Sequence, residues 1–221
     1  MIKRTLKLAA CLAPMALVVG CATNTATPYD YTAYKAAQPR SILVLPPLNN
    51  SPEVNAGNSV YAQVTYPLAE AGYYVLPVAL VNETFKQNGM TTSADIHALP
   101  PAKLKEIFGA DAGMYITITR YGASYTVLDS VVVVAADARL VDLKTGTVLW
   151  TGSATASSNE GGNNSGGGLI GVLVAAAVKQ IINSTTDRSH PIAGVTSARL
   201  LSAGYNKGLL YGPRSANYAK Q

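Results

Sequence analysis

The chain has 221 residues and a mass of 23.0 kDa, the size of one ordinary domain or of one domain with extensions. Hydrophobic residues make up 48% and charged residues 13%, whereas an average globular chain has about 25% charged residues, so a disordered charged polymer is excluded. The formal net charge is +5, but Lys3, Arg4 and Lys7 all lie in residues 1–20, which contain no acid. The rest of the chain is nearly neutral and has no basic stripe, so we expect no nucleic-acid partner.

The amino terminus has the three parts of an export signal. Met1–Lys7 is basic, Leu8–Val19 is apolar, and Val18-Val19-Gly20-Cys21 resembles the bacterial lipobox, in which the cysteine is acylated and becomes the first residue after cleavage. Cys11 stands in a similar box, but only three residues separate it from Lys7, too few for an apolar core. We therefore predict a lipoprotein signal peptide at residues 1–20 and lipid attachment at Cys21. The alternatives are an ordinary secretory signal and an apolar start buried in a cytoplasmic fold.

Lipidation of Cys21 has two consequences, one for the cysteines of the mature chain and one for the membrane to which the protein is anchored. The chain has two cysteines, and cleavage before Cys21 removes the other one, so the mature chain has no internal disulfide, CxxC pair or thiolate zinc site. Ala22 is typical of lipoproteins that are sorted to the outer membrane, because the usual retention signal for the inner membrane is Asp at this position. Several acyl chains, palmitate among them, give stable anchoring. We predict a lipid-anchored protein of the bacterial outer membrane, on the periplasmic side or at the cell surface.

The first part of the mature chain is predicted to be a tether followed by an alternation of strands and helices. Residues 21–40 have no helical or strand period, and we expect the tether's three tyrosines, Tyr29, Tyr31 and Tyr34, to lie on the domain or on a partner. Ser41–Leu45 is a short apolar run, which favours a strand buried on both faces. Further elements are expected as a helix over 58–71 that Pro67 kinks or breaks, a strand over 73–76, and helices over 78–88 and 101–108.

Three later segments alternate apolar and polar residues, namely 114–119, 131–140 and 148–157. Their even-numbered side chains are apolar and most odd-numbered ones are polar, which predicts antiparallel strands with one apolar and one polar face. Asp142–Gly146 is expected to form the turn between the last two strands. The predicted fold class is α/β: a two-layer sandwich over residues 41–158, with a small mixed sheet and helices on its apolar face. The polar face is left open, where it either docks a partner or is simply solvated.

The remaining residues are predicted to form a carboxy-terminal helical extension. Residues 159–168 are a Gly- and Asn-rich linker, and residues 169–221 form the extension and a polar tail, with a last short helix over 195–203. Residues 169–182 predict an apolar helix of about 21 Å, too short to cross a bilayer. This helix is buried in its own domain, against another subunit or, least favourably, on the membrane surface. We predict a homodimer in which the helices associate through Leu169, Val172, Leu173 and Ala176.

The sequence shows no motif of a known catalytic or cofactor site. His97 and His190 are the two histidines, and neither stands in an HExxH motif or at metal-ligand spacing from another candidate. No GxSxG elbow and no GxxxxGK[ST] loop occurs, and the GxGxxG match at residues 166–171 follows a linker where a dinucleotide site needs a strand. We therefore predict a protein that is not an enzyme and that has no cofactor or metal.

Four carboxylates are weighed as candidate acid–base groups, and all lie at turns or on the polar sheet face: Asp111, Asp129, Asp137 and Asp142. Turn capping explains Asp142 better than catalysis does. The alternative to an interaction protein is an envelope hydrolase or a small-ligand binder that uses Asp137, Arg139 and neighbouring tyrosines of the polar face.

Five segments together carry a resemblance to a known family: residues 42–47 (ILVLPP), 68–77 (LAEAGYYVLP), 108–112 (FGADA), 140–150 (LVDLKTGTVLW) and 210–213 (LYGP). They resemble bacterial outer-membrane lipoproteins of unknown function, typified by a neisserial surface antigen, over essentially the whole mature chain from about residue 40. The 140–150 segment is also similar to a wider group that includes the TolB amino-terminal domain, the curli secretion lipoprotein CsgG and LpoB, the lipoprotein activator of a peptidoglycan synthase. The resemblance implies a small sheet with helices packed on it. It also implies a non-enzymatic envelope protein that acts through protein–protein interaction, in secretion, envelope assembly or peptidoglycan-synthase regulation.

Overall fold

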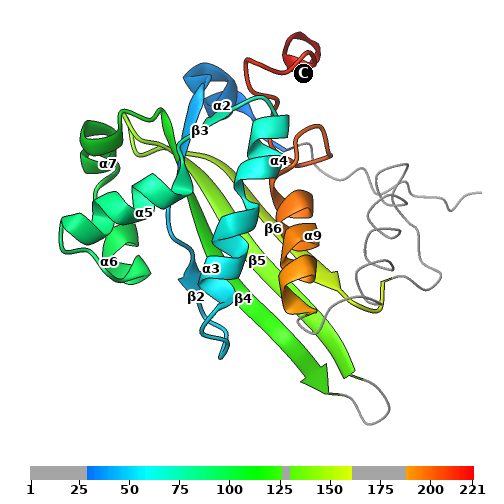
Figure 1. The fold of residues 1–221 in the computed structure, drawn as a ribbon. Coiled ribbons are helices and arrows are strands. Elements are labelled where there is room, and N and C mark those ends of the chain that lie inside the picture. Colours follow the sequence, from blue (N-terminus) through cyan, green and yellow to red (C-terminus); the bar gives the residue numbers. More distant parts are fainter. Residues whose placement is uncertain (1–28, 126–129, 161–187) are drawn as a thin grey trace, which may run out of the picture.

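A six-stranded mixed sheet organises the protein, as seen in a computed structural model that describes residues 29–125, 130–160 and 188–221 (Figure 1). The strand order is β3-β1-β4-β5-β6, and β2 also pairs with β4. β1 runs parallel to β3 and β4, whereas β4, β5 and β6 are antiparallel. The strands are β1 (Ser41–Val44), β2 (Leu48–Asn49), β3 (Tyr74–Val75), β4 (Ala112–Tyr125), β5 (Ser130–Asp142) and β6 (Val148–Ser157). This mixed α/β sheet confirms the predicted fold class.

The helices follow the start and stop signals of the sequence. They are α2 (Thr32–Ala37), α3 (Ala56–Gln63), α4 (Thr65–Glu70), α5 (Val78–Gln87), α6 (Ser93–His97), α7 (Pro101–Phe108) and α9 (Ser189–Leu201), with a 3₁₀ turn, η2, at Tyr218–Lys220. The predicted helix over 58–71 is broken in two at Val64, which is one of the two effects expected of Pro67. Pro67 lies in the first turn of α4, where no intrahelical N–H bond is lost. Pro101 begins α7, and Gly109 ends it in the left-handed conformation, φ 70°.

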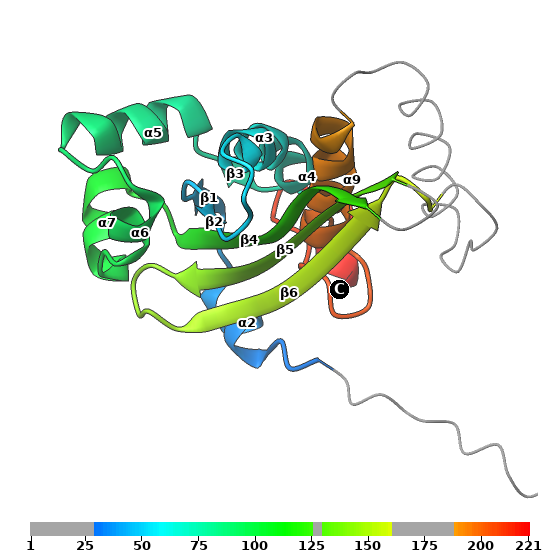
Figure 2. The ribbon, with the colours of Figure 1, turned by 90° about the horizontal axis from the view of Figure 1, so that it is seen from below.

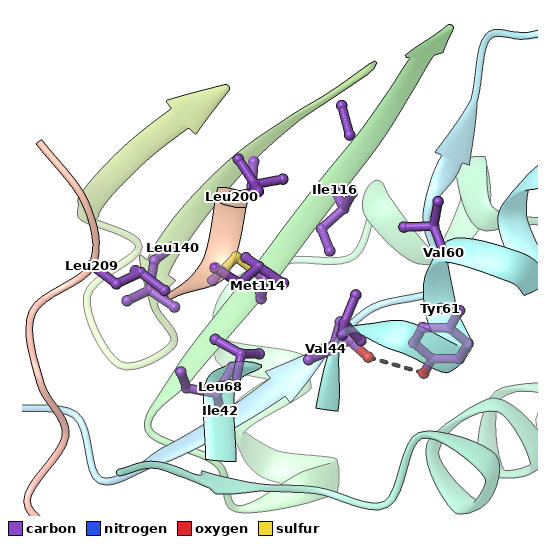
Figure 3. Packing of buried hydrophobic residues seen from close by; sticks show 14 of the residues in the cluster. Ile42, Val44, Val60, Tyr61, Leu68, Met114, Ile116, Leu140, Leu200 and Leu209 are labelled. Atoms are coloured by element: carbon purple, nitrogen blue, oxygen red, sulfur yellow. Dashed lines mark hydrogen bonds between the residues drawn. The ribbon is translucent and has the colours of Figure 1, made fainter. Parts of the chain in front are cut away.

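The larger core lies on the face of the sheet that α3, α4 and α9 cover. Figure 3 shows side chains from the sheet, among them Met114, Ile116 and Leu140, meeting Leu68 of α4 and Leu200 of α9. All of these side chains are buried. The Tyr61 hydroxyl of α3 donates to the Val44 carbonyl of β1 at 3.0 Å, which satisfies the one polar atom that this tyrosine brings into the core. The even-numbered alternation therefore points into the core, as the sequence predicted.

A second core occupies the opposite face, at one end of the sheet. It joins Leu43, Leu45, Tyr115, Val141 and Leu143 to apolar side chains of α5, α6 and α7, and Figure 2 shows these three helices grouped at that end. The helices thus lie on both faces of the sheet, whereas the sequence predicted helices on one face only. The physical reason is that β1 is apolar on both faces, so each face of it needs a cover. Beyond this end, the second face carries no helix in the described ranges.

The domain is larger at both ends than residues 41–158. Residues 29–40, predicted as part of the tether, contain α2, in which Tyr34 is 2% exposed. Tyr29 and Tyr31 pack on the core, so of the two expected positions, on the domain or on a partner, these tyrosines take the first. α9, predicted to belong to a separate extension, buries Ile192, Ala193 and Leu201 in the main core. Sequence reasoning missed both because the contacts that hold them join residues far apart in the chain.

Two β-bulges limit the predicted alternation. The register of β4 against β5 shifts between Ile118 and Arg120, so Thr119 is the extra residue and its hydroxyl donates to the Ala135 carbonyl at 3.2 Å. After the shift, odd-numbered Tyr121 packs on the main core. A second shift, between Leu140 and Val141, lets both Leu149 and Trp150 be buried. The alternation of the sequence therefore holds only between these irregularities.

Candidate functional site

The candidate site is the open face of β4, β5 and β6, on the side opposite α9. A hollow of about 520 Å³ lies on it. Its lining combines hydroxyl, charged and aromatic side chains from four elements and the β2 edge: Leu48, His97, Tyr115, Thr117, Asp137, Ala138, Arg139, Thr151, Gly152 and Ser153. The hollow is open to solvent, so this is a shallow surface and no enclosed pocket.

Strand register arranges the polar side chains of this face in two rows. Tyr115 pairs with Arg139, and Arg139 pairs with Thr151, so one row crosses all three strands. Thr117, Asp137 and Ser153 form the next row in the same way. Directly opposed residues in neighbouring antiparallel strands place their side chains on the same face about 5 Å apart. The predicted polar face is therefore continuous across the sheet.

An aromatic and cationic stack forms the floor of the hollow. The guanidinium carbon of Arg139 lies 4.5 Å from the centroid of the buried Tyr115 ring, and the His97 ring meets Tyr115 edge-on at 5.2 Å between centroids. His97 Nε2 lies 2.9 Å from the Pro46 carbonyl oxygen. Because a carbonyl only accepts, Nε2 carries the proton, which fixes the orientation of the ring.

Burial sets the protonation states in this stack. It lowers the pKa of His97, and the Arg139 charge lowers it further, while the hydrogen bond to Pro46 raises it. Burial raises the pKa of Tyr115, against the effect of Arg139. Both rings are therefore neutral at neutral pH, and Arg139 is the charged member of the stack.

Asp137 and Arg139 are the exposed charges that the central strand β5 places on this face, and Arg120 of β4 lies on the same face opposite Ala135. Asp137 and Arg139 occupy alternate positions of β5, and neither forms an ion pair with any residue of the described ranges. In the described part of the chain, no group of three or more His, Cys, Asp or Glu side chains could hold a metal ion. One free carboxylate and one free guanidinium beside a row of hydroxyls can form charge-assisted hydrogen bonds with a partner.

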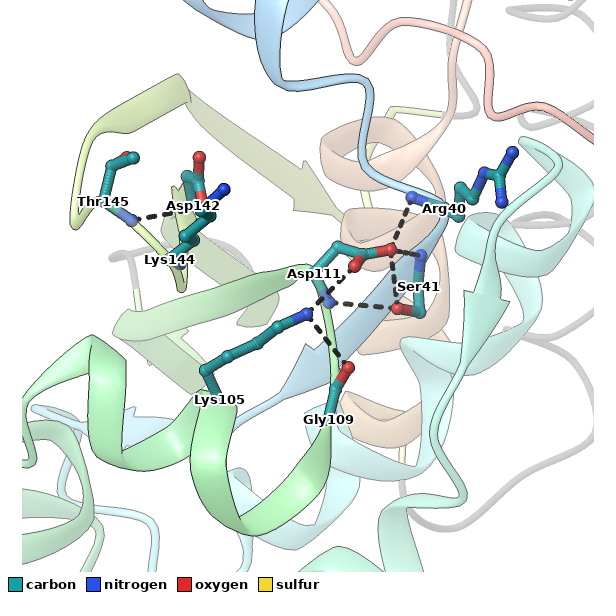
Figure 4. Close-up of polar contacts among 8 residues, drawn as sticks. All are labelled: Arg40, Ser41, Lys105, Gly109, Asp111, Asp142, Lys144 and Thr145. Carbon is teal, nitrogen blue, oxygen red and sulfur yellow. Dashed lines mark hydrogen bonds and ion pairs between the residues drawn. The ribbon is translucent and has the colours of Figure 1, made fainter.

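The other sequence candidates have structural roles. Asp111 accepts hydrogen bonds from the backbone N–H of Arg40 and Ser41 and from Lys105 Nζ, which lies 3.1 Å away, and it ties the start of β1 to the end of α7 (Figure 4). Burial raises the pKa of Asp111, but these hydrogen bonds outweigh it and hold the pKa below its usual value. Asp142 accepts from the backbone N–H of Lys144 at 2.7 Å, which confirms its predicted role as a turn cap.

His190 is also explained by packing. Its ring nitrogens lie 2.7 Å from Ser59 Oγ and 2.8 Å from Gln63 Nε2, so it links α9 to α3. Asp129, the lipidation candidate Cys21 and the glycine motif at 166–171 lie outside the described residues. So do the predicted self-association residues Leu169, Val172, Leu173 and Ala176.

Sequence reasoning missed the contribution of α6, which brings His97 to the hollow. A signal for this helix exists at Thr92-Ser93-Ala94-Asp95, which has the spacing of a capping box. In the structure the Thr92 hydroxyl accepts from the Asp95 backbone N–H at 3.2 Å and donates to the Asp95 carboxylate at 2.6 Å. The position of His97 against Tyr115 follows from tertiary packing, and no local pattern shows it.

These features define a small α/β protein with an open sheet face. None of its described helices is long and apolar enough to cross a bilayer. Residues 29–214 match a family model described as "Putative lipoprotein GNA1162-like", and the chain belongs to this lipoprotein family, as its resemblance predicted.

Individual relatives agree with the family. The chain is 54% identical to "Putative lipoprotein NMB1124/NMB1162" of Neisseria meningitidis serogroup B over 203 residues, which cover 92% of this chain and 94% of that protein. The crystal structure of lipoprotein GNA1162 from Neisseria meningitidis is 60% identical and matches with a TM-score of 0.54, covering 66% of this chain and 100% of the other. The LpoB C-terminal domain from Salmonella enterica is 17% identical with a TM-score of 0.37, covering 57% of this chain and 98% of that domain. A similarity this low supports no conclusion about function.

Proposed function

We propose that this lipoprotein is not an enzyme and that it docks another envelope protein on the open face of β4, β5 and β6. The process served would be secretion, envelope assembly or regulation of a peptidoglycan synthase. One observation carries the proposal: Asp137 and Arg139 project from the centre of a continuous polar face, and neither has an ionic partner among the described residues. Opposite charges displayed side by side give orientation and specificity to a protein contact more than they give stability to the fold.

The chemistry of the face indicates what kind of surface fits it. A partner would present a carboxylate to Arg139, a basic group to Asp137, and backbone or side-chain polar groups to Thr117, Thr151 and Ser153. Tyr115, against which His97 packs edge-on, holds the Arg139 side chain in place before binding. A preorganised contact of this kind loses little side-chain entropy when the partner arrives.

A second candidate is the binding of a small ligand in the hollow itself. Its volume of about 520 Å³ is within the range of ligand sites, and its floor is aromatic. Its open shape favours the protein partner, because small-molecule sites usually bury most of the ligand. A hydrolase is less favoured, since Asp137 is the one carboxylate among the described residues that line the hollow, and the hydrogen bond of His97 goes to the Pro46 carbonyl rather than to Asp137.

Photo-crosslinking in intact cells would test the docking proposal. A photoreactive residue in place of Ser153 should form a discrete adduct with an envelope protein, which mass spectrometry of the adduct would identify. The same residue in place of Lys86, which is exposed on α5, serves as the matched control and should not form that adduct. Adding Arg139→Glu to the Ser153 variant should abolish it, and an acid-to-Lys change in the identified partner should restore it. Equal adducts from both positions, or an adduct insensitive to Arg139→Glu, would reject the open face as the docking surface.

We also propose that acyl chains on Cys21 anchor the protein to the outer membrane. The family membership and the three-part signal support this. Mass spectrometry of the mature amino terminus should show lipid on Cys21. The Cys21→Ala variant should no longer be found in the outer-membrane fraction. An unmodified terminus near Ala22, or a Cys21→Ala protein that remains membrane-bound in the same way, would contradict the anchor.

The third proposal is a homodimer formed through the apolar segment 169–182. Its support is the sequence LIGVLVAAAVKQII, which has no charged residue before Lys179. Replacing Leu173 and Val174 by Asp should convert a dimer of the unlipidated protein to monomer while the circular dichroism signal is retained. Sedimentation of the unmutated protein as a monomer would reject the dimer.

A further inference from the structure

The two terminal segments of the described chain lie together at one end of the molecule. α2 and the carboxy-terminal end occupy the same end in both views (Figures 1 and 2). The Tyr31 hydroxyl donates to the Gly208 carbonyl at 2.6 Å, and the Tyr73 hydroxyl, 2.8 Å from that of Tyr34, donates to the Leu210 carbonyl at 2.7 Å. Tyrosine hydroxyls therefore fix residues 202–221 against residues 29–40. We call this end of the molecule, made of these two segments, the terminal surface.

Two adjoining hollows lie on the terminal surface. Their volumes are about 200 and 470 Å³, and they share Leu210, Tyr211 and Gln221 in their walls. Lys35 lines the first, and Lys207 and Lys220 line the second. No Asp or Glu side chain lines either hollow. The charged side chains that line both hollows are therefore all basic, and both hollows have tyrosines in their walls.

Positive charge is concentrated at this end of the protein. Segments 29–40 and 202–221 carry five basic side chains and one acidic, Asp30, whereas the rest of the described chain carries eight basic and nine acidic. The five are all exposed, and none forms an ion pair with a described residue: Lys35, Arg40, Lys207, Arg214 and Lys220. In side-chain charge the terminal surface is therefore cationic, while the rest of the described chain is not.

The chain leaves the described fold towards the proposed lipid anchor from this same end. Tyr29 is the first described residue and follows Cys21 by eight positions, which span at most about 28 Å of extended chain. A bilayer that held acyl chains on Cys21 would thus lie within about 28 Å of the terminal surface. Tyrosine and basic residues are the side chains enriched at membrane interfaces, and Tyr205, beside the second hollow, is 40% exposed.

We propose that the terminal surface binds an anionic phospholipid bilayer beside the lipid anchor. Lys35, Lys207 and Lys220 contact lipid phosphates at the two hollows, and the exposed Tyr205 lies at the level of the headgroups. The attraction is electrostatic and acts without acyl chains, so it is measurable on protein that carries no lipid. Together with the anchor, it would hold the domain in one orientation on the membrane.

Vesicle co-sedimentation tests this directly. The protein used is the chain from residue 21 onward with Cys21→Ser, which keeps every described residue and cannot be acylated. Vesicles of phosphatidylethanolamine with about 30% phosphatidylglycerol are compared with neutral phosphatidylcholine vesicles at low ionic strength, where screening is weak. We expect binding to the anionic vesicles only, weakening as salt is raised.

A matched pair of variants locates the contact. The triple variant Lys35→Gln, Lys207→Gln, Lys220→Gln should lose about fivefold in partitioning for each lysine, on the order of 100-fold together. The control triple Lys86→Gln, Lys103→Gln, Lys144→Gln changes the net charge equally but lies on α5, α7 and the β5–β6 turn, all exposed. It should change partitioning less than threefold. Thermal melts followed by circular dichroism check that both triple variants are folded. If the melting temperature of the Lys35/Lys207/Lys220 triple variant falls, the single variant Lys220→Gln is used in its place.

The outcomes separate the proposal from its rivals. Equal losses from the two triples would mean a general charge effect and would overturn it, as would binding to neutral vesicles or no binding at low salt. The assay contains no envelope protein, so its failure would leave the docking proposal for the open sheet face standing. Success with vesicles would in turn say nothing about the partner at Arg139.

Discussion

The two faces of β4, β5 and β6 are built from the same strands, but helices cover one face and solvent contacts the other. Leu140 is 0% exposed beneath α9, whereas Arg139, its neighbour in the chain, points to the open face and is exposed. The covered face contains apolar side chains of three helices, and the open face contains hydroxyls and the exposed charges of Arg120, Asp137 and Arg139. The comparison teaches that stability and recognition are divided between the faces, because strand side chains alternate from one face to the other.

The sharpest test of this division compares two adjacent residues. Leu140→Ala should lower the free energy of unfolding by about 2–5 kcal/mol, because it removes a fully buried side chain and leaves a cavity. Arg139→Ala should change it by about 1 kcal/mol or less, since an exposed guanidinium loses only its contact with Tyr115. Urea denaturation followed by circular dichroism measures both. Similar costs for the two variants would show that the open face supports the fold as much as the core does.

The next largest effect is expected from a change in β6. A Cβ atom at Gly152 would lie 2.2 Å from Cζ2 of Trp150, because the indole ring extends over this glycine on the covered face. Gly152→Ala must therefore displace the indole, and we expect a loss of about 1–3 kcal/mol with an altered near-ultraviolet dichroism of the single tryptophan. Ser153→Ala, one residue away on the open face, is the control and should stay within about 0.5 kcal/mol. An unchanged tryptophan signal in Gly152→Ala would contradict the packing.

The smallest effect is a pH dependence that arises from His97, in the floor of the hollow. Burial lowers the pKa of His97 below the value of about 6.5 that it has in the unfolded chain. The unfolded state then binds a proton more readily, so the protein loses stability as pH falls through 6.5, and the loss stops growing below the folded pKa. His97→Gln keeps an N–H donor for Pro46 and cannot titrate.

Thermal melts between pH 8 and pH 5 measure this effect. The melting temperature of the unmutated protein should fall relative to that of His97→Gln as the pH decreases. Asp111 acts in the same direction but only at more acidic pH, because its pKa is lowered from an ordinary value of 3.8. Parallel melting curves for the two proteins would mean that the His97 ring is solvated and is not held against Tyr115.

Much of the fold could be predicted from local sequence. α5 and α7 begin and end close to the predicted residues, β1 is buried on both faces, and Gly146 takes φ 75° in the predicted turn after Asp142. These features depend on propensity, alternation and turn chemistry within a few residues of one another. The polar character of the candidate site was predictable for the same reason, since Thr117, Asp137 and Ser153 are all at odd positions of alternating strands.

The pairing of these residues depends on register, and the sequence does not show register. The bulges at Thr119 and near Leu149 interrupt the alternation where no proline or glycine marks them. The neighbourhood of His97, Tyr115 and Arg139 joins a short helix to two strands, and residues 97 and 139 are far apart in the chain. Such contacts are decided by the packing of α6 against the sheet.

The sequence by itself therefore determined the alternating strands, the break before Pro67 in the helix predicted over 58–71, and the family to which the chain belongs. Each of these rests on residues that are neighbours in the chain or on a pattern of such residues. Only the tertiary structure decided that residues 29–40 and 188–221 belong to the domain, that helices lie on both faces at one end of the sheet, and that the two basic termini form one surface. The contacts responsible, such as Tyr31 with Gly208 and Tyr73 with Leu210, join residues more than 130 positions apart. Such contacts form only when the sheet has brought its flanking segments together, and a local pattern carries no information about a partner so far along the chain.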